Sequence, residues 1–384
     1  MNICVLTSSY PINDIDIAAP FVRPFVQEIE KFGHRACVFT PARRGAPVGW
    51  DESATVYRFD YLVADNSLVG LRFTSPIDLM RMASLLWNGE RQLLRLIEER
   101  QIATCLALWA VPSGYWAWRA KRVLGIPYAV WALGSDLNAW AHYPLTRTVV
   151  RRVLIDADTL FADGFDLCRK ARQLADKECE FLSSARTLSL EQRSAVDLDS
   201  RQVHFLFIGR WEKVKGVDVL LQALELLERE IGHDRLAAHI LGGGSLESWM
   251  RRFISDHCLA DMVQLVPNVS LPTLIGYLIA ADCIVIPSRS ESIPLVFSEA
   301  LQANLPLIVS DVGDMGVLVR DYEVGWVIPP DNPMALKQAM RRFLEEGYQP
   351  SLRREKLLSL MDLRTSASRY SEVIGRMEAQ RVRS

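Results

Sequence analysis

Residues 282–301 constrain the fold of this chain more than any other stretch. They open with a short apolar run, 282–287 (DCIVIP), which is typical of a buried strand in a parallel sheet. The spacing of apolar residues then becomes helical, and Pro294 suits a first helical turn. The loop carries Glu291, and Glu299 follows within the helix. The sequence therefore predicts a strand, a loop and a helix N-terminus, the place where open α/β sheets bind anionic ligands.

The two glutamates are placed to contact different parts of one ligand. Glu291 lies before the free N–H groups of the helix, and Glu299 lies about five residues into the helix, or roughly 7 Å along its axis. One acceptor at the helix mouth and one deeper would match a ligand with hydroxyl groups on both sides of a phosphate. The alternative is that Glu299 is a solvated helix residue and that Glu291 favours the helix dipole.

Length and composition limit the class of protein. A chain of 384 residues suits two domains, with 49% hydrophobic and 23% charged residues as in ordinary globular proteins. The net charge of −2 argues against a nucleic-acid binder. The seven cysteines are scattered, so neither a disulfide framework nor a metal site is predicted. Without a signal-peptide core or a long apolar run, we expect a cytoplasmic protein.

The first half of the chain is predicted to be a doubly wound domain. Apolar runs at 3–7 and 36–39 flank a helical pattern at 21–29, which makes a βαβ unit, and Ala19 lies in the loop before that helix. Residues 77–100 form a long amphipathic pattern. Its arginines either are solvated or meet a membrane surface as a peripheral contact.

Two further predicted strands, 105–109 and 128–133, should open their following loops at the carboxyl edge of the sheet. Residues 145–182 are predicted to be helical. Residues 183–202 are polar and lack a clear period, so they are predicted to be the linker between two domains.

Several tryptophans fall in this part of the chain. Because aromatic faces stack on sugar rings, Trp109 and Trp140 are candidates for binding an acceptor sugar. The alternative for such residues is core packing, which we expect for Trp116 and Trp118 because they begin a helix.

The second half begins with a predicted strand at 204–209 and a loop that contains Arg210 and Lys215. Two fixed cations in a strand-to-helix loop could neutralise a leaving diphosphate. A later strand leads into a glycine turn centred on Gly243, which as a plain βα turn would merely permit close packing. Val269 lies just before another predicted helix.

Two of these stretches resemble a known family. They are Glu291-Ser-Ile-Pro followed by Glu299-Ala, and Gly209-Arg210 followed by Lys215-Gly216. Together they resemble the signature of the retaining, nucleotide-sugar-dependent glycosyltransferases of family 4 (glycosyl transferases group 1), which have the GT-B fold. The resemblance implies an α/β protein with two Rossmann-like domains facing an interdomain cleft. The domains would span 1–190 and 201–364, with a last helix at about 365–384 packing back on the first domain.

The resemblance also implies roles for particular residues. Arg210 and Lys215 would bind the donor diphosphate, Glu299 the ribose hydroxyls, and Glu291 the hydroxyls of the transferred sugar. Further donor contacts would come from Gly243, Val269, the backbone of Ser292, Ile293 and Leu295, and Ala19 in a loop where relatives carry glycine.

In the first domain the chain departs from the family. Relatives tend to carry histidines where this chain has Leu106, Leu108 and Leu133. A leucine neither donates a hydrogen bond nor takes up a proton, so the role of the histidine is taken by backbone groups, by Asp136, or by nothing in this chain.

The implied reaction is retaining transfer of a sugar from a nucleotide-diphosphate donor, of the UDP-glucose or UDP-glucuronate type, to a hydroxyl of a polysaccharide or glycolipid. In the family the leaving phosphate is thought to assist deprotonation of the acceptor, so no metal or other cofactor is expected. The main alternative, favoured by the three leucines, is a sugar-nucleotide-binding partner of another transferase that has lost catalysis. A GT-B epimerase or phosphorylase is a third alternative.

Overall fold

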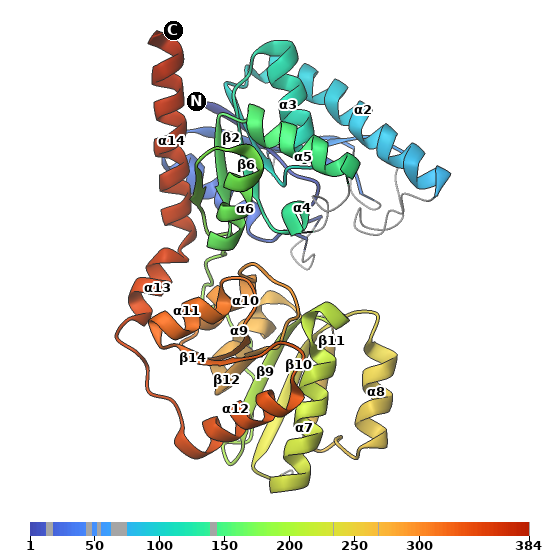
Figure 1. Cartoon of the computed structure of the whole chain (residues 1–384), viewed down its shortest axis with the longest axis vertical. Coiled ribbons are helices and arrows are strands. Elements are labelled where there is room, and N and C mark those ends of the chain that lie inside the picture. The colour runs from blue at the N-terminus through green and yellow to red at the C-terminus, as the bar shows by residue number, and fades with distance from the viewer. Residues whose placement is uncertain are drawn as a thin grey trace. The chain divides into compact units, whose positions relative to one another are not determined.

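The chain forms two compact units (Figure 1). This computed structural model describes residues 1–12, 18–43, 48–51, 55–62, 75–138, 144–232, 234–267 and 269–383. The first unit comprises Met1–Ser184 and Leu363–Ser384, and the second comprises Ala185–Asp362. The second unit is therefore inserted, in sequence, before the last helix of the first.

The first unit is built on an eight-stranded sheet in the order β3-β4-β2-β1-β5-β6-β7-β8. Only β3 runs antiparallel to its neighbour among these pairs. The chain passes from β2 to its parallel neighbour β4 through β3, and helices connect the other successive parallel strands. The strands are β1 Asn2–Leu6, β2 Arg35–Pro41, β3 Gly49–Asp51, β4 Val56–Phe59, β5 Thr104–Leu108, β6 Tyr128–Ala132, β7 Thr159–Ala162 and β8 Cys179–Phe181.

Helices cover both faces of this sheet (Figure 1). They are α1 Val22–Lys31, α2 Pro76–Arg100, α3 Ser113–Leu124, α4 Ser135–Asn138, α5 Pro144–Asp156, α6 Phe165–Ala175 and α14 Leu363–Arg383. On one face, α2, α3, α5 and α6 contribute to one apolar core that includes the fully buried Trp116. On the other face, Phe25 of α1 lies 4.8 Å from Trp131 and 6.0 Å from Tyr370 of α14, measured between ring centroids.

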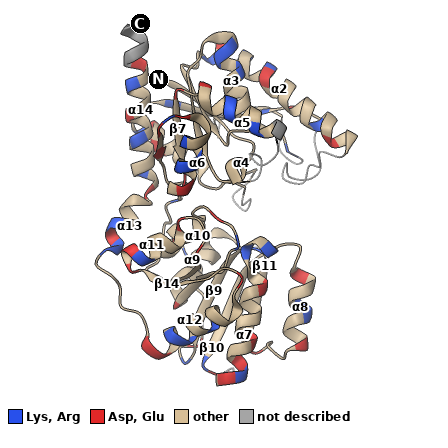
Figure 2. Ribbon diagram, in the orientation of Figure 1, with Lys and Arg blue, Asp and Glu red and all other residues tan. Residues whose placement is uncertain are grey.

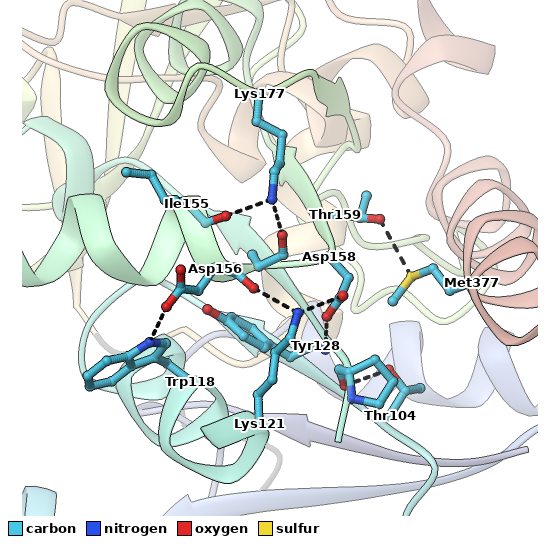
Figure 3. A network of polar contacts seen from close by, with 12 residues as sticks. Thr104, Trp118, Lys121, Tyr128, Ile155, Asp156, Asp158, Thr159, Lys177 and Met377 are labelled. Atoms are coloured by element: carbon cyan, nitrogen blue, oxygen red, sulfur yellow. Dashed lines mark hydrogen bonds and ion pairs between the residues drawn. The ribbon is translucent and has the colours of Figure 1, made fainter. Parts of the chain in front are cut away.

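A polar network ties the amino ends of the strands in the first unit (Figure 3). Lys121 Nζ donates to the backbone oxygen of Asp156 (2.9 Å) and to Asp158 Oδ1 (2.7 Å). The other oxygen of Asp158 accepts from the backbone N–H of Tyr128 at 2.9 Å. Lys177 Nζ donates to backbone oxygens at the end of α5. These contacts fix the edge of the sheet opposite to the loops that follow β5 and β6.

The prediction that residues 145–182 are helical throughout is wrong in part. Helices α5 and α6 are present, but β7 and β8 lie between and after them. These strands contain only four and three residues, so neither is long enough to establish a period of its own.

The second unit is a six-stranded, entirely parallel sheet in the order β11-β10-β9-β12-β13-β14. Its strands are β9 Val203–Arg210, β10 Leu236–Gly243, β11 Val263–Pro267, β12 Cys283–Ile286, β13 Leu307–Ser310 and β14 Gly325–Ile328. Its helices are the 3-10 turn η3 Lys213–Lys215, α7 Val217–Ile231, α8 Glu247–Asp256, α9 Leu271–Ala280, α10 Leu295–Gln302, α11 Met315–Tyr322, α12 Pro333–Glu346 and α13 Arg354–Leu360. Helices on both faces make this unit a doubly wound, Rossmann-like sheet (Figure 1).

The segment 185–202, expected to be part of a linker, packs onto the second unit. Gln302 of α10 donates through Nε2 to the backbone oxygen of Arg186 (2.9 Å) and accepts through Oε1 from the backbone N–H of Leu188 (2.8 Å). The N–H of Ser194 donates to the oxygen of Pro272 at 2.9 Å. The segment contains no helix or strand, yet its contacts make it part of this unit.

Figure 2 shows basic and acidic residues on both units, and the two signs nearly balance, with a net charge of −2. Within the described ranges, no helix combines the length and the apolar character needed to span a bilayer.

Candidate functional site

The loop between β12 and α10 places Glu291 against a cation from another loop. Lys215 Nζ donates to Glu291 Oε1, and Ser288 Oγ donates to the same oxygen at 3.0 Å. The two charged side chains are 22% and 12% exposed, so a ligand can reach this ion pair. The structure thus brings together two of the predicted site residues.

The second predicted cation, Arg210, comes directly before the loop that carries Lys215. Arg210 is the last residue of β9 and is exposed. Among the residues that the structure describes, its guanidinium has no hydrogen-bond or ion-pair partner. A guanidinium with its donors available is suited to binding an anion.

Two glycines lock the loops of this site together. A Cβ atom at Gly216, whose φ is +69°, would lie 1.9 Å from the backbone oxygen of Pro287. A Cβ atom at Gly313, with φ of +55°, would lie 2.3 Å from the backbone oxygen of Glu291. Only glycine allows such close approach with this backbone conformation, so the loops after β9, β12 and β13 are in direct contact.

Arg289 adds a charged clamp that the sequence did not reveal. Its guanidinium donates to both carboxylate oxygens of Asp218, at 2.7 and 2.9 Å, and to Asp331 Oδ1 at 2.6 Å. Its backbone N–H donates to the oxygen of Val214 at 2.8 Å. Arg289 therefore holds the turn that carries Lys215 against the loop that carries Glu291.

Glu299 is buried and paired. It is 2% exposed, which excludes the alternative of a solvated helix residue. Its Oε1 accepts from Nε of Arg186 at 2.7 Å. Burial raises the pKa of Glu299, and the neighbouring Arg186 guanidinium opposes that rise. Arg186 was not singled out from the sequence because its polar surroundings indicated a linker.

The other predicted donor residues lie along the same carboxyl edge of the second sheet. A Cβ atom at Gly243 would meet nothing within 4 Å, whereas Gly242 and Gly244 abut Gly209 and Trp211. The turn therefore packs closely at its flanks and is open at its centre. Val269 precedes Ser270, which caps α9. Ser292, Ile293 and Leu295 lead from Glu291 into α10, which no side chain caps.

In the first unit, two predicted site residues have unusual backbone conformations. Ala19 has φ of +46° and Trp109 has φ of +67°, a region that favours glycine. Trp109 is half-buried directly after β5. Trp140 lies outside the described residues. Core packing is confirmed for the fully buried Trp116, while the half-buried Trp118 donates to Asp156 Oδ2 at 2.7 Å.

Asp136 is engaged with the backbone. It is 1% exposed and accepts from the N–H groups of Ala110 (2.9 Å), Gly134 (3.1 Å) and Leu137 (3.1 Å). Burial raises its pKa, and these N–H donors lower it. The carboxylate thus connects the loops after β5 and β6.

The leucines at the family's histidine positions belong largely to the core. Leu106 and Leu108 are fully buried in β5, and Leu133 is half-buried after β6. In the described part of the chain, no group of three or more His, Cys, Asp or Glu side chains is arranged to hold a metal ion.

Comparison with protein families gives a match in the second unit. Residues 189–357 match the model of the family described as glycosyl transferases group 1. The matched range contains Arg210, Lys215, Glu291 and Glu299, and it also contains the clamp residue Arg289.

Individual relatives cover the chain more fully. TuaC of Bacillus subtilis (strain 168), whose name assigns it to teichuronic acid biosynthesis as a glycosyltransferase, is 27% identical over 366 residues, which are 90% of each chain. The structure of sucrose-phosphate synthase from Thermosynechococcus elongatus matches with a TM-score of 0.79 at 18% identity, over 99% of both chains. Anabaena HepE, solved in complex with UDP-glucose, matches with a TM-score of 0.71 at 12% identity, over 99% of this chain and 100% of that one. The two structural matches show a shared fold.

Proposed function

We propose that this chain, which over residues 189–357 belongs to the group 1 glycosyl transferases and which has the GT-B fold, transfers a hexosyl group from a nucleotide-diphosphate sugar to an acceptor hydroxyl. The observation that carries this proposal is the pairing of Glu291 with Lys215 at the mouth of α10. An accessible carboxylate beside an accessible cation provides an acceptor for sugar hydroxyls and a counter-charge for phosphate.

Each charged residue of the second unit has a proposed part in donor binding. Arg210 and Lys215 bind the diphosphate, Glu299 accepts from the ribose hydroxyls, and Glu291 accepts from hydroxyls of the transferred sugar. The remaining donor contacts are backbone groups at Gly243, Val269, Ser292, Ile293, Leu295 and Ala19. Arg289 supports this arrangement because it fixes the turn that presents Lys215.

The proposed reaction retains the configuration at the sugar's anomeric carbon, as in family 4. The bond from that carbon to the diphosphate oxygen breaks, and its electron pair leaves with the diphosphate. The acceptor oxygen forms the new bond on the same face, and its proton passes to the leaving phosphate. Arg210 and Lys215 stabilise the developing negative charge, so we propose a reaction that does not depend on a metal. Asp136 acts on this step indirectly, because its carboxylate holds together the loops after β5 and β6.

UDP-glucose or UDP-glucuronate is the donor that we propose, and the acceptor is a growing polysaccharide or a glycolipid. Two relatives support this choice: HepE was solved with UDP-glucose, and TuaC is named for teichuronic acid biosynthesis. Trp109 and Trp140 are the proposed contacts to the acceptor sugar.

Release of nucleotide from a panel of UDP-, GDP- and ADP-sugars, in the presence of a chelator, tests this function. We expect slow hydrolysis of one donor, accelerated by an acceptor oligosaccharide and lost in Glu291→Ala. Binding of a donor without turnover, even with acceptors present, would contradict catalysis and leave a sugar-nucleotide-binding partner of another transferase.

A glycolipid acceptor calls for contact with a membrane, and α2 offers a suitable surface on what we propose is the cytoplasmic side. Ile77, Met80 and Trp87 are 59%, 61% and 70% exposed, and their spacing places them on one face of the helix. Arg91 and Arg95 continue that face and, within the described ranges, have no acidic partner. Apolar residues followed by arginines suit the interface of an anionic bilayer.

We therefore expect the protein to sediment with phosphatidylglycerol vesicles and not with phosphatidylcholine vesicles. A double variant, Met80→Ser with Trp87→Ser, should lower binding at least about 10-fold, because both side chains lose their burial in the lipid interface. Leu352, which is 98% exposed and lies outside α2, provides the control Leu352→Ser. Equal losses in both variants, or no sedimentation of the unaltered protein, would contradict this surface.

A further inference from the structure

The guanidinium of Arg186 lies in the donor site although its residue belongs to the irregular segment before β9. Its side chain is 15% exposed and its Nε lies 2.7 Å from Glu299 Oε1. We infer that Arg186 is a positioning residue for the donor: it holds one oxygen of the Glu299 carboxylate so that the other receives the ribose hydroxyls. This inference rests on the role proposed above for Glu299.

The backbone of Arg186 is fixed as firmly as its side chain. Gln302 lies one turn beyond Glu299 on α10 and contacts the segment twice, at the oxygen of Arg186 and the N–H of Leu188. Its Nε2 also donates to the oxygen of Ser298 at 3.3 Å. The Gln302 amide thus both donates to and accepts from the backbone of the segment, as the backbone of a neighbouring β-strand would. Arg186 is therefore already ordered for its contact with Glu299, with little conformational entropy left to lose.

The chemistry of Glu299 requires such a partner. A carboxylate this deeply buried would otherwise take up a proton, because burial disfavours the charged form. The ionised carboxylate accepts through both oxygens, whereas the protonated acid must donate through one of them. Two adjacent hydroxyls of a ribose are both donors, so they are bound best by the ionised form. Arg186 supplies the positive charge that keeps Glu299 in that form.

Other charged groups near α10 are engaged elsewhere. Arg354 of α13 donates to the backbone oxygens of Ala300 and Leu301. Lys215 is paired with Glu291 on the loop before the helix. Arg186 is thus the charged group that contacts Glu299 among the residues that the structure describes.

A different role for Arg186 would be to block the site until a nucleotide displaces it. The two roles predict opposite changes in nucleotide affinity when Arg186 is removed. If Arg186 positions Glu299, its removal weakens nucleotide binding, and the loss is greatest at acid pH. If Arg186 blocks the site, its removal strengthens binding at every pH.

Calorimetric titration of the full chain with UDP, GDP and ADP between about pH 6 and pH 8 separates these outcomes. For the nucleotide that binds, we expect Arg186→Met to weaken binding at least about 10-fold near pH 6 and by less near pH 8, where Glu299 ionises without help. Arg186→Lys, which keeps the charge, should bring the pH profile back to that of the unaltered protein. Arg193→Met, an exposed arginine of the same segment, is the control. Unchanged or tighter binding of Arg186→Met at all pH values would overturn the inference.

A second measurement needs no ligand, and so distinguishes failure of this inference from failure of the proposed function. Without Arg186, the folded-state pKa of Glu299 should rise further above its unfolded value. A carboxyl group with a raised folded pKa loses stability as pH rises from the unfolded to the folded value. The melting temperature of Arg186→Met should therefore fall further below that of the unaltered protein as pH rises through this window, and adding Glu299→Gln should abolish the trend. A deficit that does not change with pH would overturn the inference, whether or not any nucleotide binds.

Discussion

Glu291→Gln is expected to lower the rate of sugar transfer at least about 100-fold while leaving the affinity for free nucleotide unchanged or higher. Glutamine has nearly the same shape but carries no charge, so it loses the ion pair with Lys215 and accepts more weakly from sugar hydroxyls. Free nucleotide lacks the transferred sugar, so that second loss does not affect its binding. Lys215, released from Glu291, has its full charge available for the diphosphate.

Single-turnover transfer rates and nucleotide titrations on the same preparations measure the two effects. Glu346→Gln removes a surface ion pair with Arg342 on α12 and should change neither quantity. If Glu291→Gln lost nucleotide affinity and transfer rate in equal measure, Glu291 would not contact the transferred sugar in the way that we propose. The complementary variant Glu299→Gln should show the opposite pattern, in which nucleotide affinity falls more than the transfer rate.

Gly216→Ala is expected to reduce both stability and activity strongly. Any Cβ at φ of +69° costs about 1–2 kcal/mol. At Gly216 the new methyl group would also lie 1.9 Å from the oxygen of Pro287, so the turn has to move away from the β12 loop. Lys215 precedes this glycine directly, and its contact with Glu291 would be lost as well.

Gly125 provides a matched comparison, because it has the same φ of +69° at the end of α3 and a Cβ there would meet nothing within 4 Å. Gly125→Ala should lower the melting temperature only by the conformational cost and keep its transfer rate. Gly216→Ala should lower it considerably further and lose most of its activity. Equal shifts in melting temperature with activity retained in both would show that the β9 and β12 loops are not locked in the way described.

The strand and helix around the site could be predicted because the sequence there changes its period sharply. The apolar run before Pro287 and the helical spacing after Pro294 correspond to β12 and α10. The contact of Lys215 with Glu291 could not be predicted, since the residues are 76 positions apart. Their approach depends on backbone packing at Gly216, which local patterns do not encode.

The side-chain contacts of Arg186 and Arg289 could not be predicted from local sequence patterns either. Each is one arginine in a polar loop, where a solvated charge is the ordinary interpretation. Arg289 reaches Asp218 and Asp331, which are 71 and 42 positions away. Arg186 reaches Glu299 across 113 positions. Asp136 carried a local signal, its place in a loop at a strand end, but its three N–H donors only become evident once the sheet has formed.

The return of α14 to the first unit has a consequence for synthesis on the ribosome. Tyr370 and Ile374 of this helix are fully buried, and α14 lies against α1 from the beginning of the chain. All residues of the second unit are translated before α14 emerges, so that unit can fold while the first still lacks a helix. We therefore expect the second unit to begin folding while the apolar surface of the first unit is open, and the first unit to depend on chaperones until α14 has packed against it.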